Sequence, residues 1–209
     1  MAILLFCQKT TLLACDDIAK EAKVSGTVFQ QLEGNQKALP DAVVAIWQSA
    51  DAAQVKKIDP YVLKLQKPGF AKKHVAIQVN QPLVIDIEYK NNYAFEIHGA
   101  HYETRNFIIR GDEEKYELTF NKSNGIVYLK SNSCDAKCVI TICPSPMFAI
   151  TDKQGKYSLN AILKEGEYDV YIIHPELGVN KQRITIVSRE MKDVDFVLRK
   201  TRPRDDRMP

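Results

Sequence analysis

The chain has 209 residues, of which 45% are apolar and 26% charged, as is ordinary for a soluble globular protein that buries a core. Its 29 basic and 26 acidic side chains leave a net charge of +3. The basic residues are nearly balanced by acidic ones and are scattered along the sequence, whereas a nucleic-acid-binding surface needs them clustered. No stretch of the sequence approaches the ~20 apolar residues that a membrane-spanning helix requires, so we expect no transmembrane span.

The N-terminal segment, residues 1–22, has two interpretations. It begins MAILLFCQKTTLLACDD, and its Leu12-Leu13-Ala14-Cys15 is similar to the end of a bacterial lipoprotein signal. In that interpretation Cys15 is lipidated and anchors an exported protein. In the alternative the segment is a simple arm or strand, because Lys9 interrupts the apolar run and no basic residue precedes it.

From Lys23 onward, alternation of period two dominates over helical spacing, and Asn, Gly, Asp and Pro separate the short apolar runs. This pattern predicts an all-β chain, folded as a sandwich or barrel. We expect SADAAQVKK to form a single helical turn, and the tail 200–209 to be disordered because it has little to bury. The expected strands and the first loop are, in chain order, VSGTVFQQ, the polar loop LEGNQKALPD, AVVAIW, HVAIQV, LVIDIEY, YAFEIH, NFIIR, KYELTF, GIVYL, CVITIC, MFAI, KYSL, EYDVYII, RITIV and DVDFVL.

Two stretches that lie far apart resemble parts of one carboxypeptidase-regulatory-like (transthyretin-like) domain. The first is VSGTVFQQLEGNQKALPDAVVAIW, and the second is FAITDKQGKYSLNAILKEGEYDVYIIHPELG. In the second, Gly155 is suited to the positive φ of a tight hairpin, and Asp152 to capping the amides of that turn. The family is an accessory fold, so the resemblance implies no peptidase activity. The positions that match the family pattern are Thr151, Asp152, Gly155, Tyr157, Gly166 and Tyr168.

The segment between those stretches resembles a cupredoxin-like domain, through QKPGFAKKHVAIQVNQPLVIDIEYKNN and EIHGAHYETRNF. Together the two resemblances imply two Greek-key β-sandwiches, arranged as in methylamine-utilisation-type proteins. The transthyretin-like host takes residues 23–50 and 146–199, and the cupredoxin-like insert takes residues 51–145.

This arrangement predicts which strands share a core. AVVAIW is apolar on both faces and VSGTV is too short to be stable alone, so we expect both to pair with the strands after Pro146. Trp47 should then pack on the C-terminal strands. The inward residues expected in the host are Tyr157, Tyr168, Val170, Val194 and Phe196, and those expected in the insert are Val75, Ile77, Ile85, Ile87, Phe107, Leu118, Phe120 and Val127.

The cupredoxin resemblance also implies a copper site, with His98 as the family's first histidine and Cys134 as its cysteine. The family continues with a His and a Met after that cysteine, whereas this chain reads CDAKCVITIC and its nearest Met is Met147. Half of the ligand set of a blue-copper site therefore departs from the pattern. The alternative is that His98 lies in a polar rim. His101 joins it on one ion only if Gly99 breaks the strand.

The clustered cysteines Cys134, Cys138 and Cys143 allow three interpretations. A disulfide between Cys134 and Cys138 would staple the shortened loop in an oxidising compartment. A metal site would combine these two thiolates with His98. In the third interpretation the cysteines are free thiols, with Cys138 and a neighbour in the core.

These observations predict a non-catalytic binding or structural module with a degenerate cupredoxin site and no cofactor. We expect export to the periplasm or cell surface, membrane contact only through a lipid on Cys15, and a protein partner held at an exposed face or edge strand. The alternative is a copper-binding electron-transfer protein that uses His98 and Cys134. Two further motifs, Arg110-Gly111-Asp112 and His174-Pro175, are interpreted as turns, and no catalytic triad or phosphate loop is visible in the sequence.

Overall fold

The computed structural model describes residues 23–47, 58–99, 101–113, 115–123, 125–160, 163, 165–187 and 192–199. Every helix or strand assigned within these ranges is a β-strand, so the prediction of an all-β chain is confirmed. The N-terminal segment with Cys15, the helical turn expected at 49–57 and the tail 200–209 lie outside the described residues. Within the described ranges, no helix is long and apolar enough to cross a membrane.

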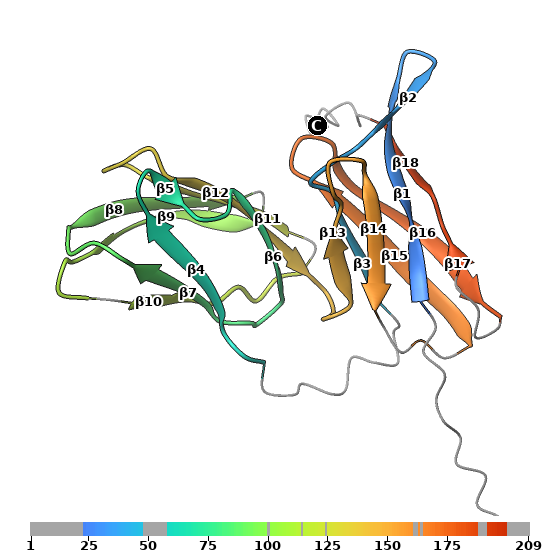
Figure 1. The fold of residues 1–209 in the computed structure, drawn as a ribbon. Helices are drawn as coiled ribbons and strands as arrows, with labels where there is room; N and C mark the ends of the chain where they lie inside the picture. Colours follow the sequence, from blue (N-terminus) through green and yellow to red (C-terminus); the bar gives the residue numbers. More distant parts are fainter. Residues whose placement is uncertain are drawn as a thin grey trace, which may run out of the picture.

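The strands form two lobes that lie side by side (Figure 1). We call residues 58–143 the middle lobe. Its strands make one sheet in the order β10-β7-β4-β5 and a second in the order β6-β12-β11-β8-β9. The strands are β4 (Tyr61–Gln66), β5 (Gly69–Phe70), β6 (His74–Gln78), β7 (Leu83–Ile87), β8 (Tyr93–Gly99), β9 (Tyr102–Ile109), β10 (Lys115–Leu118), β11 (Gly125–Ser131) and β12 (Lys137–Cys143).

The terminal lobe combines residues 23–47 with residues 146–199. One of its sheets is centred on β1, which pairs with β14 and β2 on one side and with β17 and β18 on the other; the second sheet has the order β13-β3-β15-β16. The strands are β1 (Lys23–Leu32), β2 (Asn35–Ala38), β3 (Val43–Trp47), β13 (Phe148–Ile150), β14 (Lys156–Asn160), β15 (Gly166–His174), β16 (Gly178–Ile186), β17 (Lys192–Asp193) and β18 (Phe196–Leu198).

The first strands of the chain pair with its last strands, as AVVAIW and VSGTV led us to expect. In β1, Val24 lies opposite Leu159 of β14, and in β3, Val44 lies opposite Ile172 of β15. The middle lobe closes through its own pairs, including the parallel pairs β4–β7 and β6–β12. Each lobe is thus a sandwich of two sheets.

Each sandwich has a core of its own. The expected inward residues are confirmed in both, as fully or partly buried members of the two clusters. The terminal core is built around Val28, Val44, Ile46, Tyr157, Tyr168, Val170, Ile172 and Phe196, and the middle core around Val75, Ile77, Leu83, Ile85, Phe95, Ile109, Val127 and Ile140.

A third apolar cluster joins the lobes. Val43 and Ala45 of β3 pack with Tyr171 and Ile173 of β15 against Ala76 and Cys143 of the middle lobe. Because side chains alternate along a strand, Val44 and Ile46 enter the terminal core while Val43 and Ala45 face the other lobe, which explains why AVVAIW is apolar on both faces.

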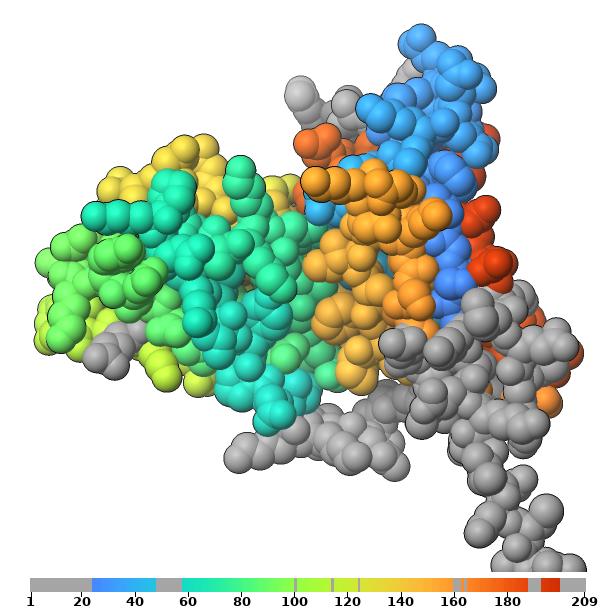
Figure 2. All heavy atoms as spheres, viewed as in Figure 1, coloured from blue at the N-terminus to red at the C-terminus, as the bar shows by residue number. Residues whose placement is uncertain are grey.

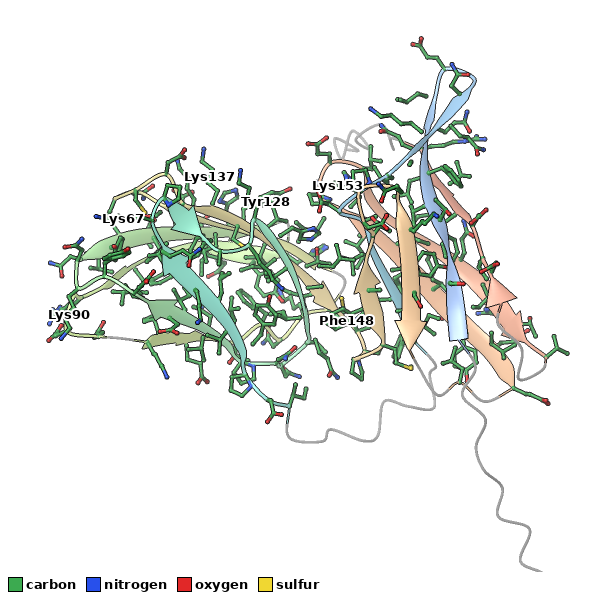
Figure 3. The ribbon with its side chains drawn as sticks, viewed as in Figure 1. Lys67, Lys90, Tyr128, Lys137, Phe148 and Lys153 are labelled. Carbon is green, nitrogen blue, oxygen red and sulfur yellow. The ribbon has the colours of Figure 1, made fainter. Side chains whose placement is uncertain are left out.

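The interface extends to aromatic side chains on both sides of β3. The Trp47 ring lies 6.5 Å from that of Tyr171, so Trp47 packs on the C-terminal strands as predicted. Phe148 of β13 joins the same cluster and lies between the lobes in Figure 3. Figure 2 shows the atoms of the lobes in contact along this face.

The turn between β13 and β14 is built as its sequence predicts. Gly155 has a φ of 73°, and the Asp152 carboxylate accepts hydrogen bonds from the N–H groups of Gln154 and Lys156 at 2.8 and 2.9 Å. Thr151 ties the turn to the start of β3, because its hydroxyl accepts from Ala42 N–H at 2.9 Å and donates to Leu39 C=O at 2.8 Å.

The segment LEGNQKALPD differs from the expected polar loop. It contains β2, which forms a hairpin with β1 from Phe29–Ala38 to Leu32–Asn35. The turn passes through Glu33 and Gly34, both at positive φ, a conformation that glycine adopts without steric cost.

Candidate functional site

The structure does not bring His98 together with Cys134. His98 lies opposite Tyr128 in the β8–β11 pair, whereas Cys134 follows Ser131, which lies opposite Phe95. Phe95 and His98 are three residues apart along β8, about 10 Å at the usual rise, and Asn132 and Ser133, just before Cys134, bond to Ala94, one residue further from His98. His98 and Cys134 also face different ways, since Phe95 points into the middle core and His98 is on the other face, while Cys134 packs against that core. The predicted ligand set is therefore not assembled.

The described neighbours of the His98 ring are an aromatic ring and a carboxylate. The His98 ring stacks on Tyr128 at 5.1 Å. Its Nδ1 atom lies 3.4 Å from Glu96 Oε1 but is buried and makes no hydrogen bond. The register of the β8–β9 pair shifts between Ile97 and Gly99, and His101 lies exposed in the following turn. Across the described ranges, no three His, Cys, Asp or Glu side chains are grouped to hold a metal.

The three cysteines of the cluster are free thiols in this structure. Burial raises the pKa of the Cys138 thiol to about 12, and it raises the pKa of the Cys143 thiol as well. Both stay protonated at neutral pH and are poor nucleophiles and metal ligands. The pairing of Cys134 with Cys138 in an oxidising compartment stays a prediction.

Hydroxyl groups hold the loop that carries Cys134. Ser131 Oγ accepts from the N–H groups of Ser133 and Cys134 at 3.2 and 3.3 Å, and Ser133 Oγ accepts from Ala94 N–H at 2.8 Å. Asn132 N–H donates to Ala94 C=O at 2.8 Å. These bonds fasten the loop to β8.

The Arg110-Gly111-Asp112 motif occupies a closed turn, as predicted. Arg110 N–H donates to the Glu113 carboxylate at 3.1 Å, and Gly111 N–H donates to Asn92 Oδ1 at 2.9 Å. Its backbone is therefore explained by the turn alone.

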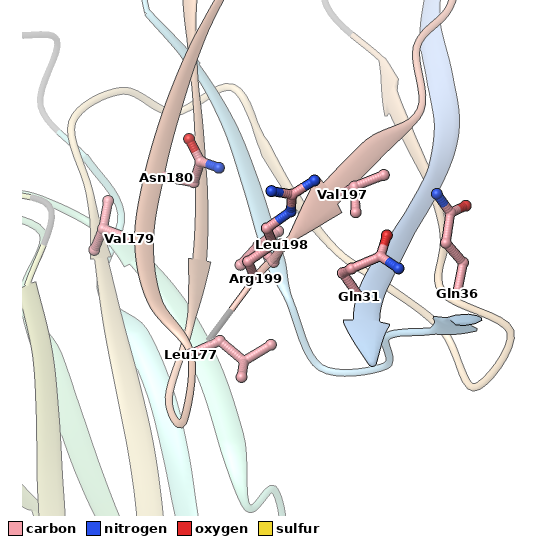
Figure 4. Close-up of a pocket in the computed structure, with 8 residues that line it drawn as sticks. All are labelled: Gln31, Gln36, Leu177, Val179, Asn180, Val197, Leu198 and Arg199. Carbon is pink, nitrogen blue, oxygen red and sulfur yellow. The ribbon is translucent and has the colours of Figure 1, made fainter. Parts of the chain in front are cut away.

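The terminal lobe has a groove at one of its open sides. β13 and β14 lie in contact at one side of the sandwich, whereas β16 and β18 are the outermost described strands at the other. Between them is a cavity of about 520 Å³ (Figure 4). Its lining residues are Gln31, Gln36, Leu177, Val179, Asn180, Val197, Leu198 and Arg199.

The groove combines an apolar floor with polar walls. Leu177 and Leu198 are buried beneath it, whereas the side chain of Val179, opposite Ile173 in the β15–β16 pair, lies on the outer face of the sheet, away from the groove. Gln31, Gln36 and Asn180 carry amide groups, which both donate and accept hydrogen bonds, and Arg199 adds a positive charge at the end of β18. Gly178, with a φ of 85°, ends the turn that begins at His174 and directs β16 along the groove.

Sequence reasoning missed this groove. Its lining comes from the β1–β2 hairpin, the start of β16 and the end of β18, which only the fold brings together. Exposed residues alternate along GVNKQRITI, but this alternation indicates only that one face of the strand meets solvent and does not locate a groove.

Comparisons with known proteins give limited information. No family model matches the chain, and no curated protein matches its sequence. Among solved structures, a copper(I) methionine-to-alanine mutant of amicyanin has a TM-score of 0.34 and 12% identity, covering 49% of this chain and 98% of amicyanin. An oxidised proline-to-alanine mutant of amicyanin has a TM-score of 0.35 and 12% identity, covering 49% of this chain and 98% of amicyanin. A reduced tryptophan-to-tyrosine mutant has a TM-score of 0.36 and 12% identity, covering 47% of this chain and 97% of amicyanin. TM-scores and identities this low carry no conclusion about the fold or chemistry of this chain.

Proposed function

We propose that this protein is a non-catalytic binding module that takes up an extended peptide segment of a partner protein in the groove between β16 and β18. The observation that carries the proposal is the position of the groove between two outermost strands. β16 is nine residues long and pairs only with β15 among the described strands. Its outer N–H and C=O groups are a template for one more strand.

The lining chemistry indicates what kind of segment would fit. Gln31, Gln36 and Asn180 suit the alternating donors and acceptors of a peptide backbone. An apolar side chain of the partner would lie on Leu177 and Leu198, and a carboxylate would pair with Arg199. The expected partner segment is therefore extended, with an apolar residue near an acidic side chain or a carboxyl terminus.

In this proposal the middle lobe is a cupredoxin-like insert, residues 51–145, within a transthyretin-like host, residues 23–50 and 146–199. The pairing of β1 and β3 with strands after Pro146 supports the division. The separation of His98 from Cys134, and the serine bonds in the Cys134 loop, support a site without copper.

The binding proposal is tested with a displayed library of random octapeptides selected on the full chain. Affinities of the selected peptides are then measured by calorimetry. We expect Asn180→Lys, which places a long charged side chain in the groove, to weaken binding at least tenfold, and Arg199→Gln to weaken only peptides that carry a carboxylate. Ile108→Lys is the matched control, because Ile108 is 63% exposed on β9, another outermost strand. Selection of no peptide, or equal losses with Asn180→Lys and Ile108→Lys, would refute the proposal.

Two measurements test whether the protein binds copper and whether it is exported. Addition of Cu(II) should give no thiolate-to-copper absorption band, and a band that disappears in Cys134→Ser would favour the electron-transfer alternative. We also propose export to the periplasm or cell surface. Mass spectrometry of the native protein should then find a processed or lipidated N-terminus, and an intact Met1 together with reduced cysteines would contradict export. Turnover of a substrate by the protein's own side chains would contradict a non-catalytic role.

A further inference from the structure

Two of the chain's four histidines lie near Asp41, where the lobes meet. His74 begins β6 of the middle lobe, and its Nε2 is 2.9 Å from Thr141 Oγ1, while its Nδ1 is buried without a hydrogen-bond partner. His174 ends β15 of the terminal lobe, and its Nδ1 accepts from Glu176 N–H at 3.2 Å.

Groups on the elements packed against the two rings change how readily each ring takes up a proton. Asp41, in the loop before β3, attracts a proton to either ring, and Glu176 does so at His174. A charge on His174 disfavours protonation of His74. The carbonyl of Asp41 faces His74 and that of Pro40 faces His174, and both favour the charged ring.

Burial outweighs these attractions. It is the largest effect on both rings, and it leaves the pKa of His74 and the pKa of His174 below the ordinary value of 6.5. The closed contact therefore holds both imidazoles in their neutral form at neutral pH, and their protonation is less costly once water reaches them.

The surrounding contacts link these rings to the rest of the interface. Tyr128 of the middle lobe donates its hydroxyl to the carbonyl of Pro175, the residue after His174, at 3.1 Å. The apolar side chains of the interface, with Ala45 and Cys143 fully buried, come from only a few residues on each lobe. A small apolar contact next to two desolvated histidines is sensitive to their charge.

We propose that the contact between the two lobes is pH-sensitive and loosens on acidification, when His74 and His174 take up protons. Each lobe stays folded while the two lobes separate. This inference does not depend on the peptide groove.

The sign follows from proton linkage. Because the loosened state takes up protons more readily than the closed state, the closed state is fully favoured above pH 6.5 and loses stability as the pH falls from 6.5 through the two lowered values. Within that window each histidine shifts the closed-to-loosened ratio by up to about tenfold for each pH unit.

Trp47 reports on the contact directly, because it is the chain's one tryptophan and packs within the interface cluster. We would record its fluorescence and the radius of gyration from small-angle scattering between about pH 8 and pH 5, with circular dichroism to follow the strands. The wild type should show a fluorescence change and an increase in radius with a midpoint below pH 6.5, while the strand signal is retained.

Variants assign the transition. His74→Gln with His174→Gln keeps neutral polar groups and should abolish the change, and each single variant should make it less steep. His101→Gln, at an exposed turn of the middle lobe, is the matched control and should behave as the wild type. An unchanged transition in the double variant, or no transition at all in the wild type, would overturn the proposal. Loss of the strand signal at the same pH would also overturn it, because the event would then be unfolding.

Discussion

Replacement of Gly155 by alanine is the sharpest test of how the terminal lobe is built. A Cβ at this position would lie 2.6 Å from Val28 C=O and 2.9 Å from Leu39 N, both backbone atoms. These atoms are already hydrogen-bonded, since Leu39 N–H donates to Val28 C=O at 2.8 Å and Val28 N–H donates to Gly155 C=O at 2.8 Å. The alanine cannot be accommodated unless β1 and the turn move apart.

The cost has two parts. Positive φ at a residue with a Cβ costs about 1 to 2 kcal/mol. Weakening two buried backbone hydrogen bonds adds about 1 kcal/mol for each. We therefore expect Gly155→Ala to lower the free energy of unfolding by about 3 to 4 kcal/mol.

Gly34→Ala is the matched control, because Gly34 has a φ of 90° but nothing lies within 4 Å of a Cβ placed there. It should cost only the conformational part, about 1 to 2 kcal/mol. Urea unfolding followed by Trp47 fluorescence measures both variants, provided that the slopes agree. If Gly155→Ala costs no more than Gly34→Ala, the close approach of backbone at Gly155 is refuted.

Three further predictions concern the buried core, the hydroxyl of Thr151 and the buried thiol of Cys138. Ile46→Ala, at a fully buried site, should cost about 3 kcal/mol in urea unfolding, whereas Val62→Ala, at a residue that is 49% exposed, should cost under about 0.5 kcal/mol; equal losses would contradict the assigned core. Thr151→Val should cost about 2 kcal/mol and Thr151→Ser much less, because only serine keeps both hydroxyl bonds; similar losses would show that the bonds are unimportant. Cys138, with a pKa of about 12, should resist iodoacetamide at pH 8 until urea is added, and rapid labelling of the folded chain would contradict its burial.

The sequence was most informative where one residue type meets one local requirement. The roles of Asp152 and Gly155 were predicted because a tight turn needs a positive φ and a cap for its amides. The doubly apolar β3 was recognised as a buried strand for the same kind of reason, since every residue from Val43 to Ile46 is fully buried.

Prediction from sequence failed where the structure of a segment depends on its contacts with distant segments and not on its own residue pattern. β2, with the sequence NQKA, carries no apolar alternation and is a strand only because it pairs with β1. β4 was overlooked although Leu63 and Leu65 alternate with exposed neighbours. The position of His98 was matched to a family by local similarity, but register places it opposite Tyr128, away from Cys134. The groove likewise depends on contacts between distant segments.

The position of β3 between two cores has a consequence for how the chain folds during synthesis. The hydroxyl of Thr151 and the N–H of Ala42, 109 residues earlier, must meet before the terminal lobe is complete. All strands of the middle lobe lie in between and pair with one another, so this lobe can form first. Its face at Ala76 and Cys143 then offers the earliest cover for Val43 and Ala45. We expect the middle lobe to act as an internal chaperone, shielding an apolar strand until β15 emerges, and nascent chains that end after Cys143 should already resist limited proteolysis there.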